Sequence, residues 1–254
     1  VCGGRAPTAR NWSAIEFNLH SAATGTMADL IVQRVPAVYP EGAFSAGLFH
    51  DFGKLLIASA APEEYELLCS MAEAGEERER EALGITHAEL SAIAVAHWNL
   101  PKPIQNAVSH HHSPGGNGDG LISLGEVVRA ADQCVNVLGM SVAPTQPPEV
   151  STAQEALGAL GIVDGVPRLL EEFEAEVAVL RPLLTRLLHP AIAPHLLRRL
   201  PDPSIARALG AMLSNTASPT LLRAGSKINV IPAVAEVDID GRLLPGQTAE
   251  DFLR

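Results

Sequence analysis

Apolar side chains recur every three or four residues through most of the first 180 positions of the chain. This spacing marks one face of an α-helix. Prolines and glycines interrupt it at intervals that fit short helices joined by loops. The predicted helices cover residues 9–35, 41 through the His50–Asp51 pair, 61–75, 76–83, 87–98, 103–112, 121–138, 153–160 and 166–180. The charged stretch 76–83 is expected to form a solvated face. The first part of the chain is therefore predicted to be a helical bundle.

The pattern changes near Pro182 and Pro190, which we expect to break the helical run. Further helices are predicted over residues 192–200 and 204–213, followed by short strand-like runs at 220–223, 228–232 and 236–240. The last run alternates polar and apolar side chains, as a strand with one wet face does. We therefore predict a mainly α protein, with a helical domain over residues 1–181 and a small α/β segment over residues 182–254.

The charge distribution supports the same division. The 254 residues carry a net charge of −11, which argues against a nucleic-acid-binding surface. Residues 1–180 have 9 basic and 23 acidic side chains, whereas residues 181–254 have 9 and 6. A change of sign of this size indicates two pieces of different origin.

Cysteine spacing and hydrophobicity bear on the compartment. Cys2, Cys69 and Cys134 lack a CxxC spacing, which favours free thiols in a reducing cytoplasm. No apolar run approaches the roughly 20 residues that span a bilayer, and no signal-peptide pattern precedes the first helix. We therefore expect a cytoplasmic protein without a membrane partner. Because the chain begins with Val1 rather than Met, we also expect a fragment of a longer protein.

Candidate chemistry is concentrated in the helical part, where seven of the nine histidines precede residue 113. A neutral imidazole beside a carboxylate, as in the His50–Asp51 pair, is a common beginning of a divalent-metal site. Taken alone, the pair is better explained as a helix end, and His20 as a core histidine. The ordered set favours a shared site instead: His20, His50, Asp51, His87, His110, His111, His112 and Asp132.

A helical bundle can bring such residues together, because each helix contributes an inward-facing side chain. Histidine and carboxylate ligands without a thiolate suit iron, manganese, zinc or magnesium. We expect one or two such divalent ions. The chemistry that this predicts is hydrolysis by a metal-activated water, with Lys54 placed to hold a phosphate oxygen.

Three stretches resemble the HDOD domain, the HD-related output domain of bacterial signalling proteins. They are residues 43–56, which read Ala-Phe-Ser-Ala-Gly-Leu-Phe-His-Asp-Phe-Gly-Lys-Leu-Leu, residues 83–97, and residues 98–112, which begin Trp-Asn-Leu-Pro-Lys-Pro-Ile. The resemblance extends from about residue 17 to 180 and implies an HD-like helical bundle. It also implies that this copy is incomplete at its N-terminus, where such domains usually have a further helical half.

HDOD belongs to the HD superfamily of metal-dependent phosphohydrolases, and that resemblance implies roles for individual residues. Asp51 and Lys54 would be catalytic, with Lys54 near the phosphate, as in the related HD-GYP phosphodiesterases. The implied metal ligands are His20, His50, Asp51 and Asp132 for the superfamily's metal, and His87, His111 and His112 for the second metal of HD-GYP enzymes.

The chain departs from the HD-GYP enzymes directly after His112. The loop reads Ser-Pro-Gly-Gly-Asn-Gly-Asp-Gly and lacks Gly-Tyr-Pro, which argues against hydrolysis of a cyclic dinucleotide. HDOD domains generally resemble signalling or scaffold modules with eroded ligand sets. This copy keeps more of the ligands than that role requires.

Residues 218–252 resemble a different family, the dimerisation (lid) domain of zinc aminoacylases and deacetylases such as acetylornithine deacetylase. The resemblance rests on Lys-Ile-Asn-Val-Ile-Pro at 227–232 and Asp-Gly-Arg-Leu-Leu-Pro-Gly at 240–246, and extends back to about residue 189. It implies that Asn229 and Arg242 reach the carboxylate end of a substrate. The alternative, a strand-end hydrogen bond and a surface charge, is preferred because that family's zinc site lies in a separate catalytic domain.

The sequence leaves three interpretations of function open. The first is a non-catalytic signalling module that binds a protein partner. The second is a metal-dependent phosphohydrolase or phosphodiesterase acting on a nucleotide or cyclic dinucleotide. The third, amidohydrolase activity through the C-terminal segment, has the least support. Exposed strand edges in that segment also predict pairing with a second copy of the chain.

Overall fold

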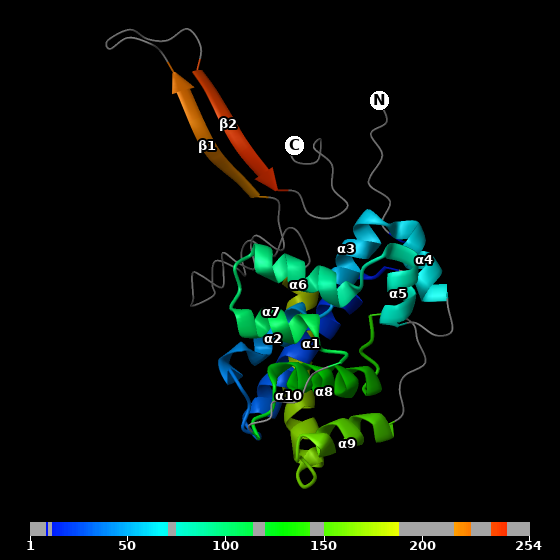
Figure 1. The fold of residues 1–254 in the computed structure, drawn as a ribbon. Helices are drawn as coiled ribbons and strands as arrows, with labels where there is room; N and C mark the ends of the chain where they lie inside the picture. The colour runs from blue at the N-terminus through cyan, green and yellow to red at the C-terminus, as the bar shows by residue number, and fades with distance from the viewer. Residues whose placement is uncertain are drawn as a thin grey trace. The chain divides into compact units, whose positions relative to one another are not determined.

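Helices make up most of the part of the chain that the structure describes, which confirms the mainly α prediction (Figure 1). The structure is a computed structural model, and it describes residue 9 and residues 12–70, 75–113, 120–142, 150–187, 216–224 and 235–242. The chain divides into two units, one spanning Thr8–Thr185 and one containing the C-terminal strands. Each unit is described by itself.

The helices of the first unit follow the predicted apolar pattern closely. The Glu76–Leu83 helix has the predicted bounds, and most of the others begin or end within a few residues of theirs. The helices are α1 (Ala14–Val32), η1 (Pro40–Gly42, a 3₁₀ turn), α2 (Ala43–Phe49), α3 (Phe52–Ala60), α4 (Pro62–Ser70), α5 (Glu76–Leu83), α6 (His87–His97), α7 (Lys102–Ser109), α8 (Leu124–Val137), α9 (Val150–Ala159) and α10 (Val166–Leu187).

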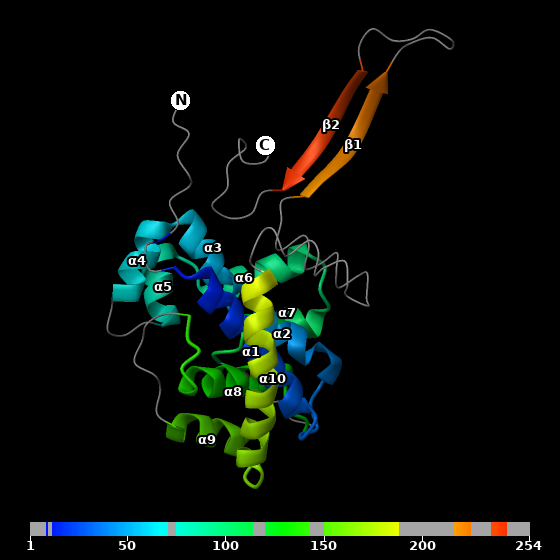
Figure 2. The ribbon, with the colours of Figure 1, turned by 180° about the vertical axis from the view of Figure 1, so that it is seen from behind.

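Helix α1 lies at the centre of the bundle. Its N-cap Ser13 accepts a hydrogen bond from the backbone N–H of Glu16 at 3.2 Å. Twelve of its 19 residues are buried, as expected of a helix that is covered on several sides. Helices α2 and α8 pack against it, and α10, nearest the viewer in Figure 2, adds Leu169 and Phe173 to the same core.

Two glycines let α1 and α2 approach closely. A Cβ atom on Gly47 would lie 2.7 Å from the Cα atom of Gly25, which is too close for any other residue type without movement of the backbone. The contact holds the end of α2 close to α1, and Nε2 of His50 lies 3.3 Å from Nε2 of His20. It therefore helps to place His50 beside His20.

The predicted helix through His50 and Asp51 is in fact two helices. Helix α2 ends at Phe49 with His50 as its C-cap, and Asp51 is the N-cap of α3. Adjacent residues within one helix point about 100° apart, whereas this break lets both side chains face the interior. The prediction of a helix through residue 112 was also wrong, because α7 ends at Ser109.

The predicted break at Pro182 was wrong as well, because α10 continues through it to Leu187. A proline inside a helix removes one hydrogen bond and costs about 3 kcal/mol. Leu169, Phe173 and Val177 bury one face of α10 in the core, and this packing offsets that cost. The boundary predicted at residue 181 falls inside this helix, and the predicted division of domains stays a prediction.

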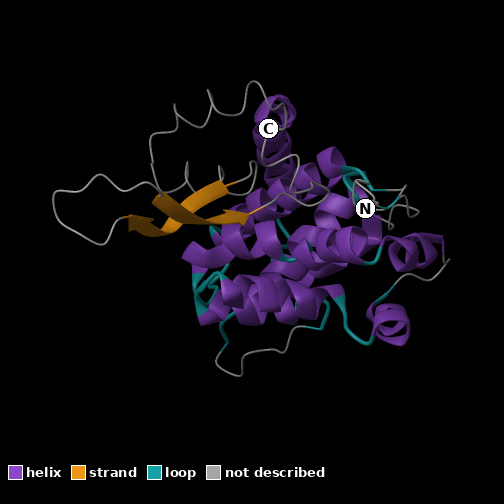
Figure 3. Ribbon diagram, turned by 90° about the horizontal axis from the view of Figure 1, so that it is seen from above, coloured by secondary structure: helices purple, strands orange, loops and turns teal. Residues whose placement is uncertain are grey.

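The described part of the C-terminal unit is an antiparallel pair of strands, orange in Figure 3. Strand β1 (Thr216–Ala224) pairs with β2 (Ala235–Arg242), so that Thr216 faces Arg242, and the register shifts between Pro219 and Leu221. The strands predicted at 220–223 and 236–240 are confirmed. The elements predicted at 192–200, 204–213 and 228–232 lie outside the described residues.

None of the helices described here combines the length and the apolar character that a bilayer crossing requires.

Candidate metal centre

The structure brings together all seven side chains that the sequence singled out as metal ligands. They come from α1, α8, the α2–α3 junction, the start of α6 and the segment after α7. They form two groups in which the candidate ligand atoms lie within 4.8 Å of one another. The first group is Asp51, His87, His111 and His112, and the second group is His20, His50 and Asp132.

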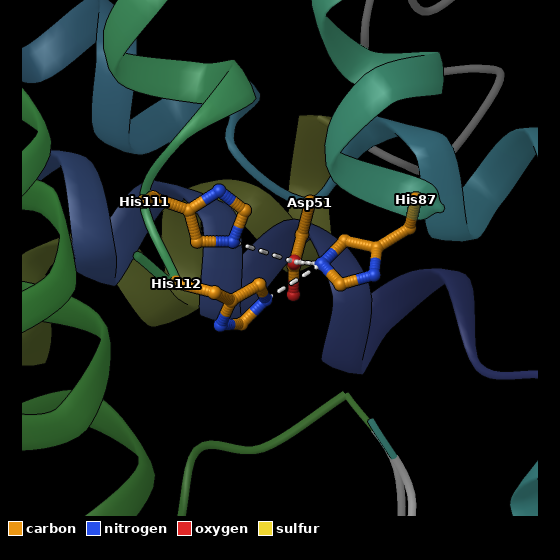
Figure 4. Close-up of side chains that lie close together, drawn as sticks. All are labelled: Asp51, His87, His111 and His112. Atoms are coloured by element: carbon orange, nitrogen blue, oxygen red, sulfur yellow. Dashed lines mark hydrogen bonds and ion pairs between the residues drawn. The ribbon is translucent and has the colours of Figure 1, made fainter. Parts of the chain in front are cut away.

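In the first group, three imidazoles surround one carboxylate (Figure 4). Oδ1 of Asp51 lies 3.3 Å from Nε2 of His87 and 3.8 Å from Nε2 of His111. Nε2 of His112 lies 2.9 Å from Nε2 of His87. Two unprotonated nitrogens repel at that distance, so either the proton of an N–H···N hydrogen bond or a bound cation lies between them.

The second group also combines imidazoles with a carboxylate, two histidines with one aspartate. Oδ1 of Asp132 lies 3.3 Å from Nε2 of His20 and 3.5 Å from Nε2 of His50. The other oxygen of Asp51, Oδ2, lies 3.4 Å and 3.5 Å from the same two nitrogens. Asp51 therefore presents one oxygen to each group, which is the arrangement of a carboxylate shared between two ions.

Backbone carbonyls fix the orientation of three of the histidines. Nδ1 of His20 donates to the carbonyl of Met140 at 2.7 Å, and Nδ1 of His50 donates to that of Gly47 at 2.7 Å. Nδ1 of His111 donates to the carbonyl of Val108 at 2.8 Å. A carbonyl oxygen only accepts, so Nδ1 holds the hydrogen and Nε2 is the atom that turns toward the centre. Histidines that bind metals are oriented in this way.

The fourth anchor is Glu79, which the sequence reasoning placed on a solvated helix face. Its side chain is only 12% exposed, and its carboxylate oxygens lie 2.7 and 2.8 Å from Nδ1 of His87. The same carboxylate accepts the backbone N–H of His87 at 2.7 Å. The sequence held a signal for this contact: Gly84, in a left-handed conformation with φ 74°, and the Thr86 capping box turn the chain back between α5 and α6.

The burial of the ligands tests whether a metal fits the site. His20, His50, Asp51 and His111 are almost completely buried. Among the described residues, Oδ1 of Asp51 and Nε2 of His111 are buried atoms without a hydrogen-bond partner. Such atoms are costly unless something satisfies them. The nitrogen-rich donor set fits manganese, iron or zinc, since magnesium prefers oxygen ligands.

The electrostatics differ from one histidine to the next. Burial opposes the charged form of His87, but hydrogen bonds with Asp51 and Glu79 outweigh it and raise its pKa. Burial opposes the charged form of His20, but hydrogen bonds and charge from Asp132 and Asp51 outweigh it and raise its pKa to about 9. Burial and the neighbouring histidines lower the pKa of His111 well below its usual value and that of His112 to about 4. His111 and His112 are therefore ready to bind a metal at neutral pH, whereas His20 must first lose a proton.

The carboxylates of the centre are held ionised. Burial alone would raise the pKa of Asp51, but the neighbouring His50 and Lys54 hold it well below its usual value. Burial likewise opposes ionisation of Asp132, and hydrogen bonds from His20 and His50 lower its pKa. Asp51 also lies at the N-terminus of α3, where the helix dipole favours a negative charge.

The remaining candidates lie in different surroundings. Nζ of Lys54 is 2.6 Å from Oδ2 of Asp51, and its side chain is 30% exposed, so it joins the centre to the solvent. His110 is exposed, and its Nδ1 meets the carbonyl of Asn106 rather than the centre. Asn229 lies outside the described residues, and Arg242 ends β2 with its side chain not described. The substrate role predicted for these two stays a prediction.

Gly53→Ala is expected to disturb the centre through its second layer of contacts. The N–H of Gly53 donates to Oγ of Ser91 at 2.6 Å, and Ser91 donates to the carbonyl of His87 at 2.8 Å. A Cβ atom on Gly53 would lie 2.0 Å from that carbonyl oxygen. We expect the free energy of unfolding in urea to fall by about 2 kcal/mol and Mn²⁺ binding to weaken as His87 moves.

Gly158→Ala is the matched control, because a Cβ atom there meets nothing within 4 Å. That change should be neutral or stabilise α9 by up to about 1 kcal/mol. Wild-type stability and Mn²⁺ affinity in Gly53→Ala would contradict the close contact.

Sequence comparisons match two families on separate parts of the chain. Residues 5–114 match the HDOD domain, and residues 186–254 match the peptidase dimerisation domain. An uncharacterised protein of Treponema pallidum (strain Nichols) is 31% identical over 77 residues, which are 28% of this chain and 14% of that protein.

Solved structures share the fold at low sequence identity. An HDOD domain protein of unknown function from Geobacter sulfurreducens superposes with a TM-score of 0.54 at 18% identity, over 68% of this chain and 62% of that one. The MmoQ response regulator of Methylococcus capsulatus has a TM-score of 0.51 at 23% identity, over 66% of this chain and 65% of that one. A phosphohydrolase candidate from Shewanella amazonensis has a TM-score of 0.52 at 19% identity, over 66% of this chain and 62% of that one.

The chain thus spans less than two thirds of each of these proteins, and identities in this range establish the fold alone. The family matches agree with the fold and with the helical and strand segments described above. Residues 5–114 of this chain are therefore similar to the HDOD domain, and residues 186–254 are similar to a peptidase dimerisation domain.

Proposed function

We propose that the helical unit is a metal-dependent phosphohydrolase of the HD type, housed in a signalling module, and that it cleaves the phosphodiester of a nucleotide. The observation that carries the proposal is the anchoring of four histidines through Nδ1, which leaves their Nε2 atoms directed at two ionised aspartates. Nε2 of His111 and Oδ1 of Asp51 are also buried without a hydrogen-bond partner, which a purely structural polar core would avoid.

The residues of the chain have separate parts in this chemistry. Bound divalent ions would lower the pKa of a water and neutralise charge on the phosphate. Asp51 would hold the two sites in register, because it gives one oxygen to each group. The partly exposed ammonium of Lys54 lies at the edge of the same carboxylate, where it can receive a phosphate oxygen. Lys54 and Asp51 are accordingly the residues that we assign to the reaction.

The proposal is tested first by metal content. Protein purified without chelator is expected to contain one or two divalent transition metal ions per chain by elemental analysis, and to hydrolyse bis(p-nitrophenyl) phosphate with added Mn²⁺. The double variant His50→Ala/Asp51→Ala should lose both properties. His110→Ala, which removes an exposed histidine next to the centre, should keep them. A wild-type chain that binds no metal after incubation with Mn²⁺, Fe²⁺ or Zn²⁺ would rule the proposal out.

A second candidate is a non-catalytic signalling module that binds a protein partner. It is favoured by the HDOD match, by the similarity to a response regulator, and by the lack of Gly-Tyr-Pro after His112. It predicts that His50→Ala/Asp51→Ala leaves partner binding intact while the fold persists. Amidohydrolase activity is the weakest candidate, since the C-terminal match is to a dimerisation domain. That segment is instead proposed to pair two copies of the chain.

A further inference from the structure

The anchor of His87 differs in kind from the anchors of the other histidines. Those three meet backbone carbonyl oxygens, two of them only three residues earlier in the chain. His87 donates instead to a side-chain carboxylate, that of Glu79, on a separate helix. The carbonyls that hold His50 and His111 stay in place as long as the helices that carry them remain folded. A side-chain anchor on another helix can be withdrawn while the helix that carries the ligand stays folded.

Helix α5 has little else to hold it against the bundle. The structure describes all of α5, and none of its residues is fully buried. Leu83 packs at the edge of the smaller apolar cluster, which contains Ile57 and Tyr65. Arg80 pairs with Glu89 of α6 at 2.9 Å, but both side chains are exposed, and such pairs contribute about 0–1 kcal/mol. Glu79 is therefore the residue through which α5 reaches the buried centre.

We propose that Glu79 is a positioning residue that couples the docking of α5 to metal binding by the first group. The inference rests on the metal centre proposed above and adds a means of regulating it. With α5 docked, the carboxylate fixes the ring of His87 so that Nε2 faces Asp51 and His112. With α5 displaced, the ring loses both its orientation and its charged partner.

The coupling is reciprocal by thermodynamic necessity. If a docked α5 raises the metal affinity of the first group by some factor, metal in that group favours the docked helix by the same factor. The second group is anchored by backbone carbonyls of other elements, so its affinity is expected to change little. A partner that draws α5 away from α6 would thus lower metal binding in the first group selectively. This gives a signalling module a direct way to control hydrolysis.

The test uses the full chain and compares Glu79→Ala, Glu79→Gln and Glu81→Ala with the wild type. Glu81 lies on the same helix, is 68% exposed and pairs with Arg78, so its removal is the matched control. Calorimetric titration with Mn²⁺ should resolve two groups in the wild type. Glu79→Ala should weaken one of them roughly tenfold and spare the other. Glu79→Gln, which accepts a hydrogen bond but lacks the charge, should fall between, and Glu81→Ala should match the wild type.

Hydrogen exchange distinguishes coupling from a merely structural role of Glu79, because only coupling makes the protection of α5 depend on Mn²⁺. In the wild type, Mn²⁺ should increase the protection of the amides of residues 76–83. The increase should vanish in Glu79→Ala and persist in Glu81→Ala. Equal Mn²⁺ affinities in Glu79→Ala and the wild type, or protection of α5 that ignores Mn²⁺, would overturn the inference.

Two further outcomes distinguish failure of the coupling from misfolding of a variant and from failure of the metal centre. If Glu79→Ala loses protection throughout its helices, it has not folded, and the isosteric Glu79→Gln decides the comparison by the same criteria. If the wild type binds no Mn²⁺, the proposed metal centre is overturned and this inference with it. Binding that is identical in all four proteins overturns the inference alone.

Discussion

The Asp51→Asn variant is expected to lose metal from both groups and to hydrolyse phosphodiesters roughly 10³-fold more slowly than the wild type. One oxygen of Asp51 faces His87 and His111, and the other faces His20 and His50. Asparagine keeps the shape of the side chain but replaces one oxygen with an NH₂ group and removes the charge. A single substitution should therefore affect both groups, which no other candidate ligand is placed to do.

Elemental analysis and Mn²⁺-dependent hydrolysis of bis(p-nitrophenyl) phosphate measure the two losses. Asp29→Asn is the control, because Asp29 bonds Gln33 on the exposed side of α1 and should leave both properties unchanged. Circular dichroism should show helical content close to that of the wild type in both variants. Retention of metal in either group by Asp51→Asn would contradict the shared position of the carboxylate.

The second large effect is that of pH on metal binding. The metal affinity of the second group is expected to rise about 100-fold between pH 6.5 and 8.5. The pKa of His20 in the metal-free protein is raised to about 9, so its imidazole carries an extra proton throughout this range. The metal must displace that proton, and the apparent affinity then gains about tenfold for each pH unit until the pKa is reached. Above pH 9 the affinity should level off.

His111 and His112 add nothing to this slope, since the pKa of each is lowered and that of His112 lies at about 4. Competition between the protein and a chelator of known pH dependence measures the slope. Titrations in two buffers of different ionisation enthalpy count the released protons, and close to one proton should leave His20 at pH 7.5. An affinity for the second group that is flat over this range would show that Asp132 and Asp51 do not hold a proton on His20.

The side chains that the structure brings together could be picked out from the sequence by their residue types and by the helix signals beside them, and their role as ligands stays a prediction. His50 and Asp51 are adjacent, Thr86 marks the start of α6 one residue before His87, and His111 and His112 end a run of three histidines. The same pattern gave most helix bounds. It did not show that α2 and α3 separate between His50 and Asp51, because a short run of apolar residues reads as continuous helix whether or not it bends.

The supporting contacts could not be read in the same way. The carbonyl of Met140 meets His20 across 120 positions of the chain, and every residue offers a carbonyl, so composition carries no signal for it. Glu79 was misplaced because a run of glutamates and arginines is ordinarily a solvated face. One of its members reaches inward only because Gly84 turns α5 back on α6. The packing that carries α10 through Pro182 is likewise a tertiary effect that outweighs a local rule.

The ligands of each group are drawn from elements that lie far apart along the chain, from α1 to α8 in the second group. An ion held by them would act as a cross-link between distant segments, closing loops much as a disulfide does. Metal binding and the stability of the helical unit would then be linked. Saturating Mn²⁺ would raise the free energy of unfolding, and a chelator that removes the ion would lower it.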